Sequence, residues 1–383
     1  MLVLQDLGKR MEPLESWMYP STTSNTAEFL HSPETCRSVG TRLGNVLASI
    51  YCDATLLSKS QTLTEDGKPW FENPDTNDLV RNEIVGRILP ILRSYFDTNT
   101  DRPEKIAKII SRDFDNSFLH TLRSSSISSP SSNVPNSMFS MGDLWTGSIL
   151  VGASPAISGS DSGFDSPEVE LGLIDWEFAA PARIGQDIAQ LSAWLYLFST
   201  SSVWSSTESH YRRAVMDAVA TGLGRFGPDF GIRPSNGPGT EGTTEPAMDE
   251  TLWRRSNAAN ILITLQEAYA HQVKEYPDYA WLVDEEHDHH GLGKERLAVI
   301  RSIWILFGRE VIYNAIEAEI RFSRFFPMGI NGGEKEAEMK WWQRVMIEVG
   351  SWHVSMAGDS SDEEFEEVVR RDGVLRRVYT VSG

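Results

Sequence analysis

Two aspartates flank a pair of short apolar segments near the middle of the chain, in MGDLWTGSILV (residues 141–151) and LGLIDWEFAA (residues 171–180). The apolar residues that end the first segment and begin the second predict two β-strands, joined as a hairpin across a Ser/Gly/Asp-rich stretch. In an antiparallel pair, the start of one strand lies beside the end of the other. The pattern therefore places Asp143 and Asp175 at the same end of the hairpin.

Most of the remaining sequence has the apolar spacing of helices, and Pro90 predicts a kink in one of them. The predicted helices cover residues 26–52, 78–96, 103–113, 184–198, 208–226, 249–275, 293–325 and 335–357. The predicted strands of the hairpin cover residues 148–151 and 168–174. The sequence thus predicts an α+β fold that is mostly α, with a central β-hairpin.

The chain divides into a short first strand, one large helical domain and an acidic tail. Residues 1–8, MLVLQDLG, predict a strand that runs into a turn and has nothing before it to pair with. Residues 9–357 form the domain, and residues 358–383, which include DSSDEEFEE, predict a solvated, flexible tail. Stretches rich in Ser, Gly or Pro predict loops at 124–137, 153–167 and 234–248.

Composition narrows the class of partner. The chain has 383 residues and a net charge of −19, which argues against broad contact with nucleic-acid phosphates or an anionic membrane face. Its two cysteines, Cys36 and Cys52, cannot form a disulfide framework, so we expect reduced thiols and a cytoplasmic protein. The sequence contains no signal peptide and no apolar run of about 18 residues, so no membrane span is predicted.

The placement of polar residues around the hairpin suits phosphoryl transfer. Such a site needs a carboxylate that receives the proton of the attacking hydroxyl, and oxygen ligands for the Mg²⁺ that bridges the nucleotide phosphates. Protein kinases put the carboxylate in a loop, one metal ligand five residues later, and a second aspartate just after the next strand. Asp143, Ser148 and Asp175 have this order and spacing.

On these motifs the chain resembles the aminoglycoside phosphotransferase and choline kinase family, in the C-terminal lobe of its kinase-like fold. MGDLWTGS is similar to the family pattern HGDxxxxN, and LIDWEFA is similar to its IDxE or IDFD pattern; ARIGQDIAQL extends the match into the next helix. The methylthioribose kinases within the family share TGS in the first motif and IDxEFA in the second. The resemblance implies ATP and Mg²⁺ as cofactors and a small-molecule hydroxyl as acceptor.

Roles are implied residue by residue. Asp143 matches the catalytic base and Asp175 the principal Mg²⁺ ligand, with Glu177 as a second ligand. Ser148 stands where most members have a metal-binding Asn. Asp187 matches the Asp that braces the catalytic loop.

Two further positions bear on the same comparison. Met141 stands where the family has a His that fixes the loop by hydrogen bonding, and a thioether cannot donate. The strand at residues 1–8 matches the hinge between lobes, which would set Asp6 and Leu7 beside ATP. No Gly-rich loop or strand Lys precedes this hinge, so the sequence predicts that the N-terminal lobe is largely missing.

Two hypotheses of different class follow. The first is an ATP-dependent phosphotransferase, a small-molecule kinase represented by an N-terminally truncated chain. The second is an inactive one-lobe pseudokinase that acts as a binding protein, with a protein partner covering the surface of the missing lobe. An ATPase unrelated to this family is a more distant third.

Other features are given structural interpretations. The run VDEEHDHHGLG (residues 283–293) fits no closed zinc pattern and predicts a solvated loop. Trp341 and Trp342 are adjacent on a predicted helix, so both cannot face the core. Ser360 and Ser361 precede acidic residues, as the substrates of an acid-directed kinase do. The segment with Arg309, Glu310 and Tyr313 falls where related kinases bind the acceptor.

Overall fold

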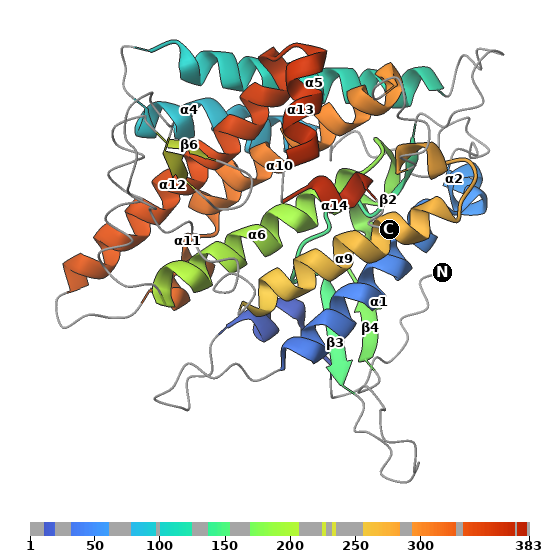
Figure 1. Cartoon of the computed structure of the whole chain (residues 1–383), viewed down its shortest axis with the longest axis horizontal. Helices are drawn as coiled ribbons and strands as arrows, with labels where there is room; N and C mark the ends of the chain where they lie inside the picture. Colours follow the sequence, from blue (N-terminus) through green and yellow to red (C-terminus); the bar gives the residue numbers. More distant parts are fainter. Residues whose placement is uncertain are drawn as a thin grey trace, which may run out of the picture.

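The computed structural model is mostly helical and carries small antiparallel sheets, in agreement with the predicted α+β class (Figure 1). It describes residues 11–19, 32–60, 78–96, 100–124, 137–153, 169–206, 224–226, 232–234, 256–283, 293–326, 332–371 and 374–380. The segment 1–8, with Asp6 and Leu7, lies outside these ranges. The predicted loops and the His-rich run at 283–293 lie outside them too, apart from residues at their edges.

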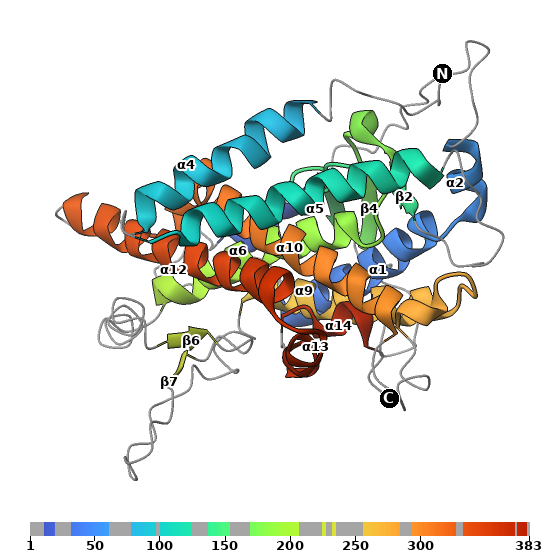
Figure 2. The same ribbon diagram turned by 90° about the horizontal axis from the view of Figure 1, so that it is seen from above.

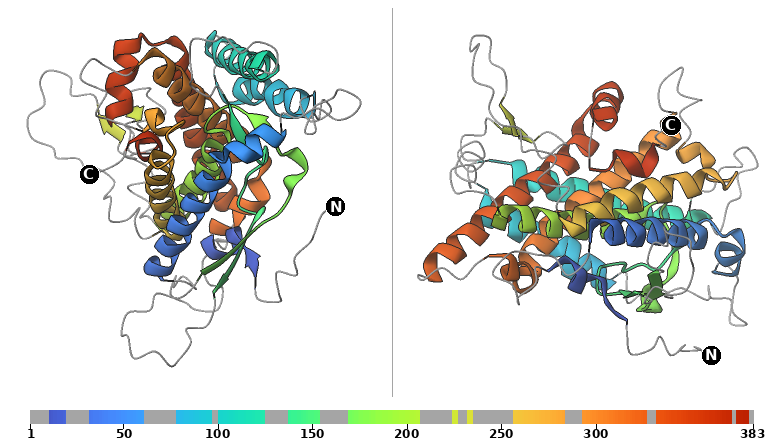
Figure 3. Two further views of the ribbon diagram at one scale, coloured as in Figure 1. Left: turned by 90° about the vertical axis from the view of Figure 1, so that its right-hand side faces the viewer. Right: turned by 60° about the horizontal axis from the view of Figure 1, so that its bottom comes forward.

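The predicted central hairpin is confirmed. Strands β3 (Ile149–Ala153) and β4 (Val169–Leu173) pair antiparallel, with Ile149 opposite Leu173 and Ala153 opposite Val169. A third strand, β1 (Glu12–Pro13), pairs antiparallel with β3 on its other side. The hairpin extends from the helical body beneath helix α1 (Figure 3). Because β4 ends beside the start of β3, Asp175 follows at the end where the loop containing Asp143 arrives.

A second small sheet closes the base of this loop. Strand β2 (Met138–Ser140) pairs antiparallel with β5 (Ala180–Ala182), with Phe139 opposite Pro181. Between β4 and β5 lies the short 3₁₀ helix η3 (Trp176–Phe178). The two sheets together hold both ends of the loop 141–148 and both ends of the turn that contains Asp175.

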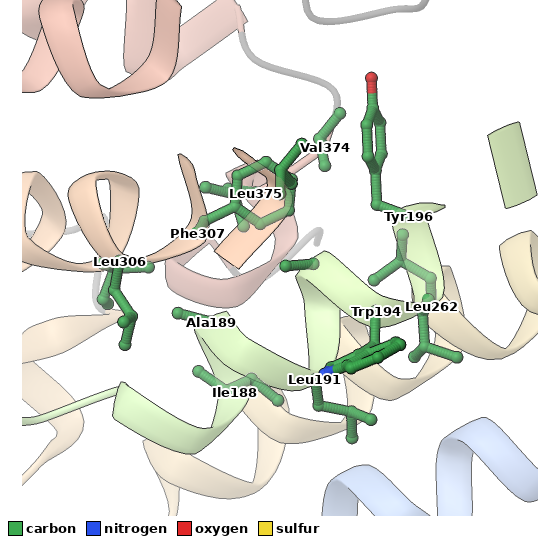
Figure 4. Packing of buried hydrophobic residues seen from close by; sticks show 14 of the residues in the cluster. Ile188, Ala189, Leu191, Trp194, Tyr196, Leu262, Leu306, Phe307, Val374 and Leu375 are labelled. Carbon is green, nitrogen blue, oxygen red and sulfur yellow. The ribbon is translucent and has the colours of Figure 1, made fainter. Parts of the chain in front are cut away.

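Helix α6 (Gln186–Ser206) is the centre of the core, with every side chain from Ile188 to Ser202 buried. It packs between α9 (Asn257–Lys274) and α10 (Lys294–Glu317). Figure 4 shows α6 side chains between those of its neighbours, with Leu375 of the C-terminal segment close by. A helix that is apolar on all sides must be enclosed, so α6 fixes the position of whatever lies at its first turn.

Helix α1 (Pro33–Tyr51) lies along α9 (Figure 1). It begins later than the predicted residue 26 because Ser32 and Pro33 form a start signal. The Ser32 hydroxyl accepts a hydrogen bond from the Thr35 backbone N–H at 3.2 Å, and Pro33 occupies the first turn, where no N–H is needed.

A second group of helices covers α10, as Figure 2 shows from above. Helices α4 (Gly86–Tyr95), α5 (Arg102–Ser124) and α12 (Gly332–Asp359) pack against it and against one another. A π-helical segment, η2 (Val80–Val85), leads into α4, and the helix continues through Pro90. Trp342 on α12 is fully buried and Trp341 is only partly so, which confirms that the two do not face the core together.

The C-terminal segment corrects the prediction of a flexible acidic tail over 358–383. Residues 362–371 form helix α13 (Asp362–Arg371) and residues 376–379 form α14 (Arg376–Tyr379). Their apolar side chains are buried, including Phe365, Val369, Leu375 and Tyr379. The many acidic residues of DSSDEEFEE obscure the apolar face of this helix in the sequence. That face is formed by Phe365 and Val369, which stand four residues apart and are buried.

The remaining described elements are short. They are η1 (Leu14–Met18), α2 (Ala54–Ser60), β6 (Gly224–Phe226), β7 (Ile232–Pro234), η4 (Ala280–Leu282), α11 (Glu319–Phe322) and η6 (Ser323–Phe325). Strand β6 lies at the end of the segment 208–226, where the sequence predicts a helix; β6 pairs with β7 instead. Within the described ranges, no helix combines the length and apolar character needed to cross a membrane.

Candidate active site

The loop between β2 and β3 is closed by its own hydrogen bonds. The Ser148 hydroxyl donates to the Trp145 carbonyl at 2.8 Å and accepts from the Trp145 N–H at 3.0 Å. The Ser148 carbonyl accepts from the Ile174 N–H at 2.9 Å, directly before Asp175. This bond ties the end of the loop to the end of β4, so the segments with Asp143 and Asp175 are held together through the backbone.

Asp187, in the first turn of α6, holds the other end of the loop. Its carboxylate accepts from the Ser140 hydroxyl at 2.7 Å, from the Met141 N–H at 2.6 Å and from the Gly142 N–H at 3.1 Å. Asp187 is almost completely buried, and burial raises its pKa, while these hydrogen bonds act in the opposite direction. A buried carboxylate with three donors is a strong anchor, because removing it would take the acceptor from the Ser140 hydroxyl and from the Met141 N–H.

Met141 takes the position where the family resemblance leads us to expect a His that fixes the loop. Met141 is fully buried, and its side chain contributes to the core. Its backbone N–H donates to Asp187, but any residue at this position could make that bond, so it does not replace the side-chain hydrogen bond expected of a His. This end of the loop is fixed by the bonds to Asp187.

Gly142 brings the loop against the Asp175 turn. Its φ of 85° lies in the left-handed region, and a Cβ built on it would stand 2.3 Å from the Phe178 carbonyl oxygen. No side chain fits at that distance, so only Gly lets the two backbones approach. Asp143 follows at once and is carried toward the same turn.

Asp143 is partly buried and lies among acidic groups. Burial raises its pKa to about 6, and repulsion from the Glu310 carboxylate adds to the rise; Asp187 and Asp175 contribute smaller effects of the same sign. The Gln190 side-chain amide donates to the Asp143 carboxylate at 2.9 Å and acts in the opposite direction. A carboxylate with a pKa near 6 can hold and release a proton near neutral pH.

Glu310 belongs to a buried polar cluster on α10. Arg309 donates to one of its carboxylate oxygens from Nε at 3.0 Å, and the Asn314 amide donates to the other at 2.9 Å. All three side chains are buried, so the ion pair offsets part of the cost of taking both charges out of water. The segment of α10 that contains Arg309, Glu310 and Tyr313 thus acts on Asp143 through the charge of Glu310.

Asp175 has the strained backbone of the site. It is the sole residue with a side chain that takes a positive φ, 66°, in the part of the chain that is described. Such a conformation costs about 1–2 kcal/mol for an L-residue and persists where the surroundings impose it. The next residue is held firmly, since Trp176 donates from its ring N–H to the Leu173 carbonyl at 2.8 Å. Asp175 and Glu177 are exposed, in contrast to Asp143.

The oxygen ligands for a cation are few. No group of three or more His, Cys, Asp or Glu side chains is close enough to hold a metal ion within the described ranges. Mg²⁺ in nucleotide sites binds through one or two carboxylates and completes its shell with water and phosphate oxygens. Asp175 and Glu177 can supply that number from the exposed turn. The Ser148 hydroxyl, fully buried, is already hydrogen-bonded to Trp145.

Sequence reasoning missed Gln190 and Asn314. Gln190 stands three residues after Asp187 on α6, a spacing that places both on one helical face, so this contact had a signal in the sequence. Asn314 and the approach of Glu310 depend on how α10 packs against α6, and no local pattern encodes that. The hinge residues Asp6 and Leu7 lie outside the described residues.

Neither a protein-family model nor a curated protein matches this chain.

Proposed function

We propose that this protein is a phosphotransferase that moves the γ-phosphate of ATP to a hydroxyl of a small metabolite with the help of Mg²⁺. The observation that supports this most directly is the environment of Asp143. Its carboxylate has a pKa of about 6 and lies in a loop anchored by Asp187, next to the turn that presents Asp175. A carboxylate base beside exposed carboxylates that can hold Mg²⁺ suits phosphoryl transfer to an alcohol.

In this proposal Asp143 accepts the proton of the attacking hydroxyl. Gln190 fixes the carboxylate by donating to it, which orients the free oxygen toward the acceptor. Asp175 and Glu177 would hold Mg²⁺, which supplies neutralisation of the phosphate charge. Ser148 braces the loop through Trp145, so the metal role rests on the two acidic residues.

The buried polar cluster beside Asp143 acts on the proposed base and not on the acceptor directly. Arg309 and Asn314 donate to Glu310, and the Glu310 carboxylate raises the proton affinity of Asp143. The cytoplasm is the proposed compartment, since both cysteines, Cys36 and Cys52, are free thiols.

Titration calorimetry with Mg-ATP tests the proposal. The chain should bind Mg-ATP at millimolar nucleotide, and Asp175→Asn should weaken that binding. Glu170→Gln is the matched control, because Glu170 is exposed on β4 and away from the turn. Asp143→Asn should keep Mg-ATP binding and remove phosphate transfer in a screen of hydroxyl-bearing metabolites. Absence of any saturable heat with Mg-ATP would contradict the proposal.

A second candidate function is binding without transfer. The bonding of Ser148 favours it, because the position of a metal-binding Asn is held by a hydroxyl that is already used inside the loop. Under this hypothesis the chain binds a metabolite near Asp143 but releases no phosphate from ATP. Neither the wild type nor Asp143→Asn would then transfer phosphate from ATP, which separates the two functions.

A further inference from the structure

A pocket lies between α4 and α12, on elements that carry none of the residues assigned to phosphate transfer. It has a volume of about 220 Å³ and is lined by Ser94, Tyr95, Lys340, Trp341 and Arg344. Pockets for drug-sized ligands usually exceed about 300 Å³, so this one suits a smaller molecule.

The lining is basic in a chain that is strongly acidic overall. Lys340 and Arg344 both contribute to the pocket, and no Asp or Glu lines it. The carboxylate that pairs with Lys340 is Glu336, and the side chains of this pair are 64% and 61% exposed. Exposed pairs of this kind contribute little to stability, so Lys340 can exchange Glu336 for a bound anion at small cost.

Arg344 carries a donor that no described residue satisfies. Its Nε atom is buried and has no hydrogen-bond partner within the described residues. A buried N–H without an acceptor is costly, so the Arg344 guanidinium gains from an anion whose oxygens reach Nε or the neighbouring N–H groups. The planar donor group of Arg also suits the oxygens of a carboxylate or phosphate.

Two aromatic side chains form flat walls. Trp341 is partly buried and has the Arg344 guanidinium carbon 5.7 Å from its ring centre. Tyr95 is held in place because its hydroxyl donates to the Gln343 side-chain oxygen at 3.2 Å. The Gln343 amide in turn donates to the Ala315 carbonyl at 3.2 Å and to Glu319 at 3.3 Å, so the wall is rigid.

We propose that this pocket binds a small anion attached to a flat apolar group, such as an aromatic carboxylate or an aryl phosphate. The anion bonds to Arg344 and Lys340, and the flat group packs against Trp341 and Tyr95. The site is independent of the proposed phosphotransfer, because the catalytic residues lie on other elements.

Calorimetric titration with benzoate, phenyl phosphate and benzyl alcohol tests the proposal. Benzoate or phenyl phosphate should bind with a dissociation constant in the millimolar range, and neutral benzyl alcohol should not bind. Saturation by benzoate alone or by phenyl phosphate alone identifies the anion, and either result supports the site. Lack of saturable binding by both anions at up to about 20 mM overturns it.

Variants decide where the anion binds. Arg344→Gln and Lys340→Gln should each weaken binding by roughly tenfold, because each removes a charge-assisted hydrogen bond. Lys340 is exposed, so Lys340→Gln preserves the fold even if Arg344→Gln does not. The matched control is Lys108→Gln on α5, an exposed lysine outside the pocket. Equal binding by wild type and both pocket variants would show that the anion binds elsewhere, for instance near Asp175, and would refute the proposal.

Discussion

At the scale of single residues, the two aspartates of the site differ in their surroundings. Asp143 is partly buried, near Glu310, and its pKa is raised to about 6. Asp175 is exposed in a left-handed turn. Pairs of carboxylates whose environments separate their proton affinities often divide the work of base and ligand. The division proposed for this protein follows from burial and not from the residue type, which is the same at both positions.

Asp143→Asn should stabilise the folded protein at high pH. The folded state binds more protons at this residue than the unfolded state between pH 3.8 and about 6, so the contribution of Asp143 to stability falls as pH rises through that range. The neutral amide removes this loss and can still accept from Gln190. We expect the free energy of unfolding in urea to rise by about 1–3 kcal/mol at pH 8 and to be unchanged at pH 4 or below.

The control for that measurement is Asp278→Asn, which neutralises an exposed aspartate. It should leave the free energy of unfolding within about 0.5 kcal/mol of wild type at both pH values. If Asp143→Asn were less stable than wild type at pH 8, the ionised Asp143 would be stabilised in the folded state. That result would contradict a raised pKa for Asp143.

His353 should make the protein sensitive to mild acid. It is almost fully buried on α12, its Nδ1 bonds to the Val349 carbonyl at 2.8 Å, and burial lowers its pKa from 6.5 to about 4. Between pH 4 and pH 6.5 the His353 side chain is therefore protonated in the unfolded chain and neutral in the folded chain. Stability is lost as pH falls from 6.5 toward 4, by up to about 3 kcal/mol.

The measurement is urea unfolding at pH 7 and pH 4.5 for wild type and His353→Leu. The variant should show a smaller difference between the two pH values, because it has no imidazole to protonate. His271→Leu, at an exposed position on α9, should keep the wild-type difference. Identical pH dependence in His353→Leu and wild type would refute the role of His353.

The motifs predict the aspartates of the site but not the groups around them. The hairpin and the helix that follows it are expected to bring three aspartates close together, namely Asp143, Asp175 and Asp187. In the structure they do lie close together. Glu310 and Asn314 come from α10, more than a hundred residues later in the chain. Their position depends on tertiary packing, which no short pattern contains.

At the scale of elements, the site depends on the contact between the loop 141–148 and the turn 175–178. Two backbone features make this contact: the Ser148–Ile174 hydrogen bond and the close approach of Gly142 to Phe178. The loop cannot move away from the turn without breaking the bonds to Asp187 as well. The segment is therefore held at both ends and in the middle.

Gly142→Ala should disrupt this contact. An added Cβ would meet the Phe178 carbonyl at 2.3 Å, and the φ of 85° is unfavourable for Ala. We expect a loss of about 2–4 kcal/mol in the free energy of unfolding, measured in urea, together with weakened Mg-ATP binding. Gly293→Ala is the matched control, since its Cβ would have no atom within 4 Å and its φ is −55°. Equal effects of the two substitutions would contradict this role of Gly142.

Helices and strands can be predicted from this sequence where the regular spacing of apolar residues is uninterrupted. The hairpin and the helices α6, α9, α10 and α12 fall close to the expected ranges. The α13 helix escapes prediction because its two inward residues stand among acidic ones, which suggests solvent on all sides. Helix ends are set by capping groups such as Ser32, and these shift boundaries by several residues.

At the scale of the whole molecule, the C-terminal segment closes the core. Arg301 on α10 donates to the carbonyls of Ser360 and Ser361, both at 3.0 Å, and stands 4.3 Å from the ring centre of Phe365. Trp304 donates from its ring N–H to the Tyr379 hydroxyl at 3.0 Å. These bonds dock α13 and α14 on α10, the helix that carries Glu310. The C-terminal segment therefore helps to hold in place a helix of the candidate site.

Truncation after residue 361 should therefore unfold the protein or leave it without a cooperative transition. It removes the buried side chains of α13 and α14 together with Val374 and Leu375. At about 1.5–3 kcal/mol for each large apolar side chain, the loss is on the order of 10 kcal/mol, comparable to the whole stability of a domain. Thermal unfolding followed by circular dichroism checks this. The control is Glu363→Gln with Glu364→Gln, at exposed positions in the first turn of α13, which should lower the melting temperature only slightly because no buried side chain is lost. A truncated chain that melts at the wild-type temperature would show that the segment adds nothing to the core.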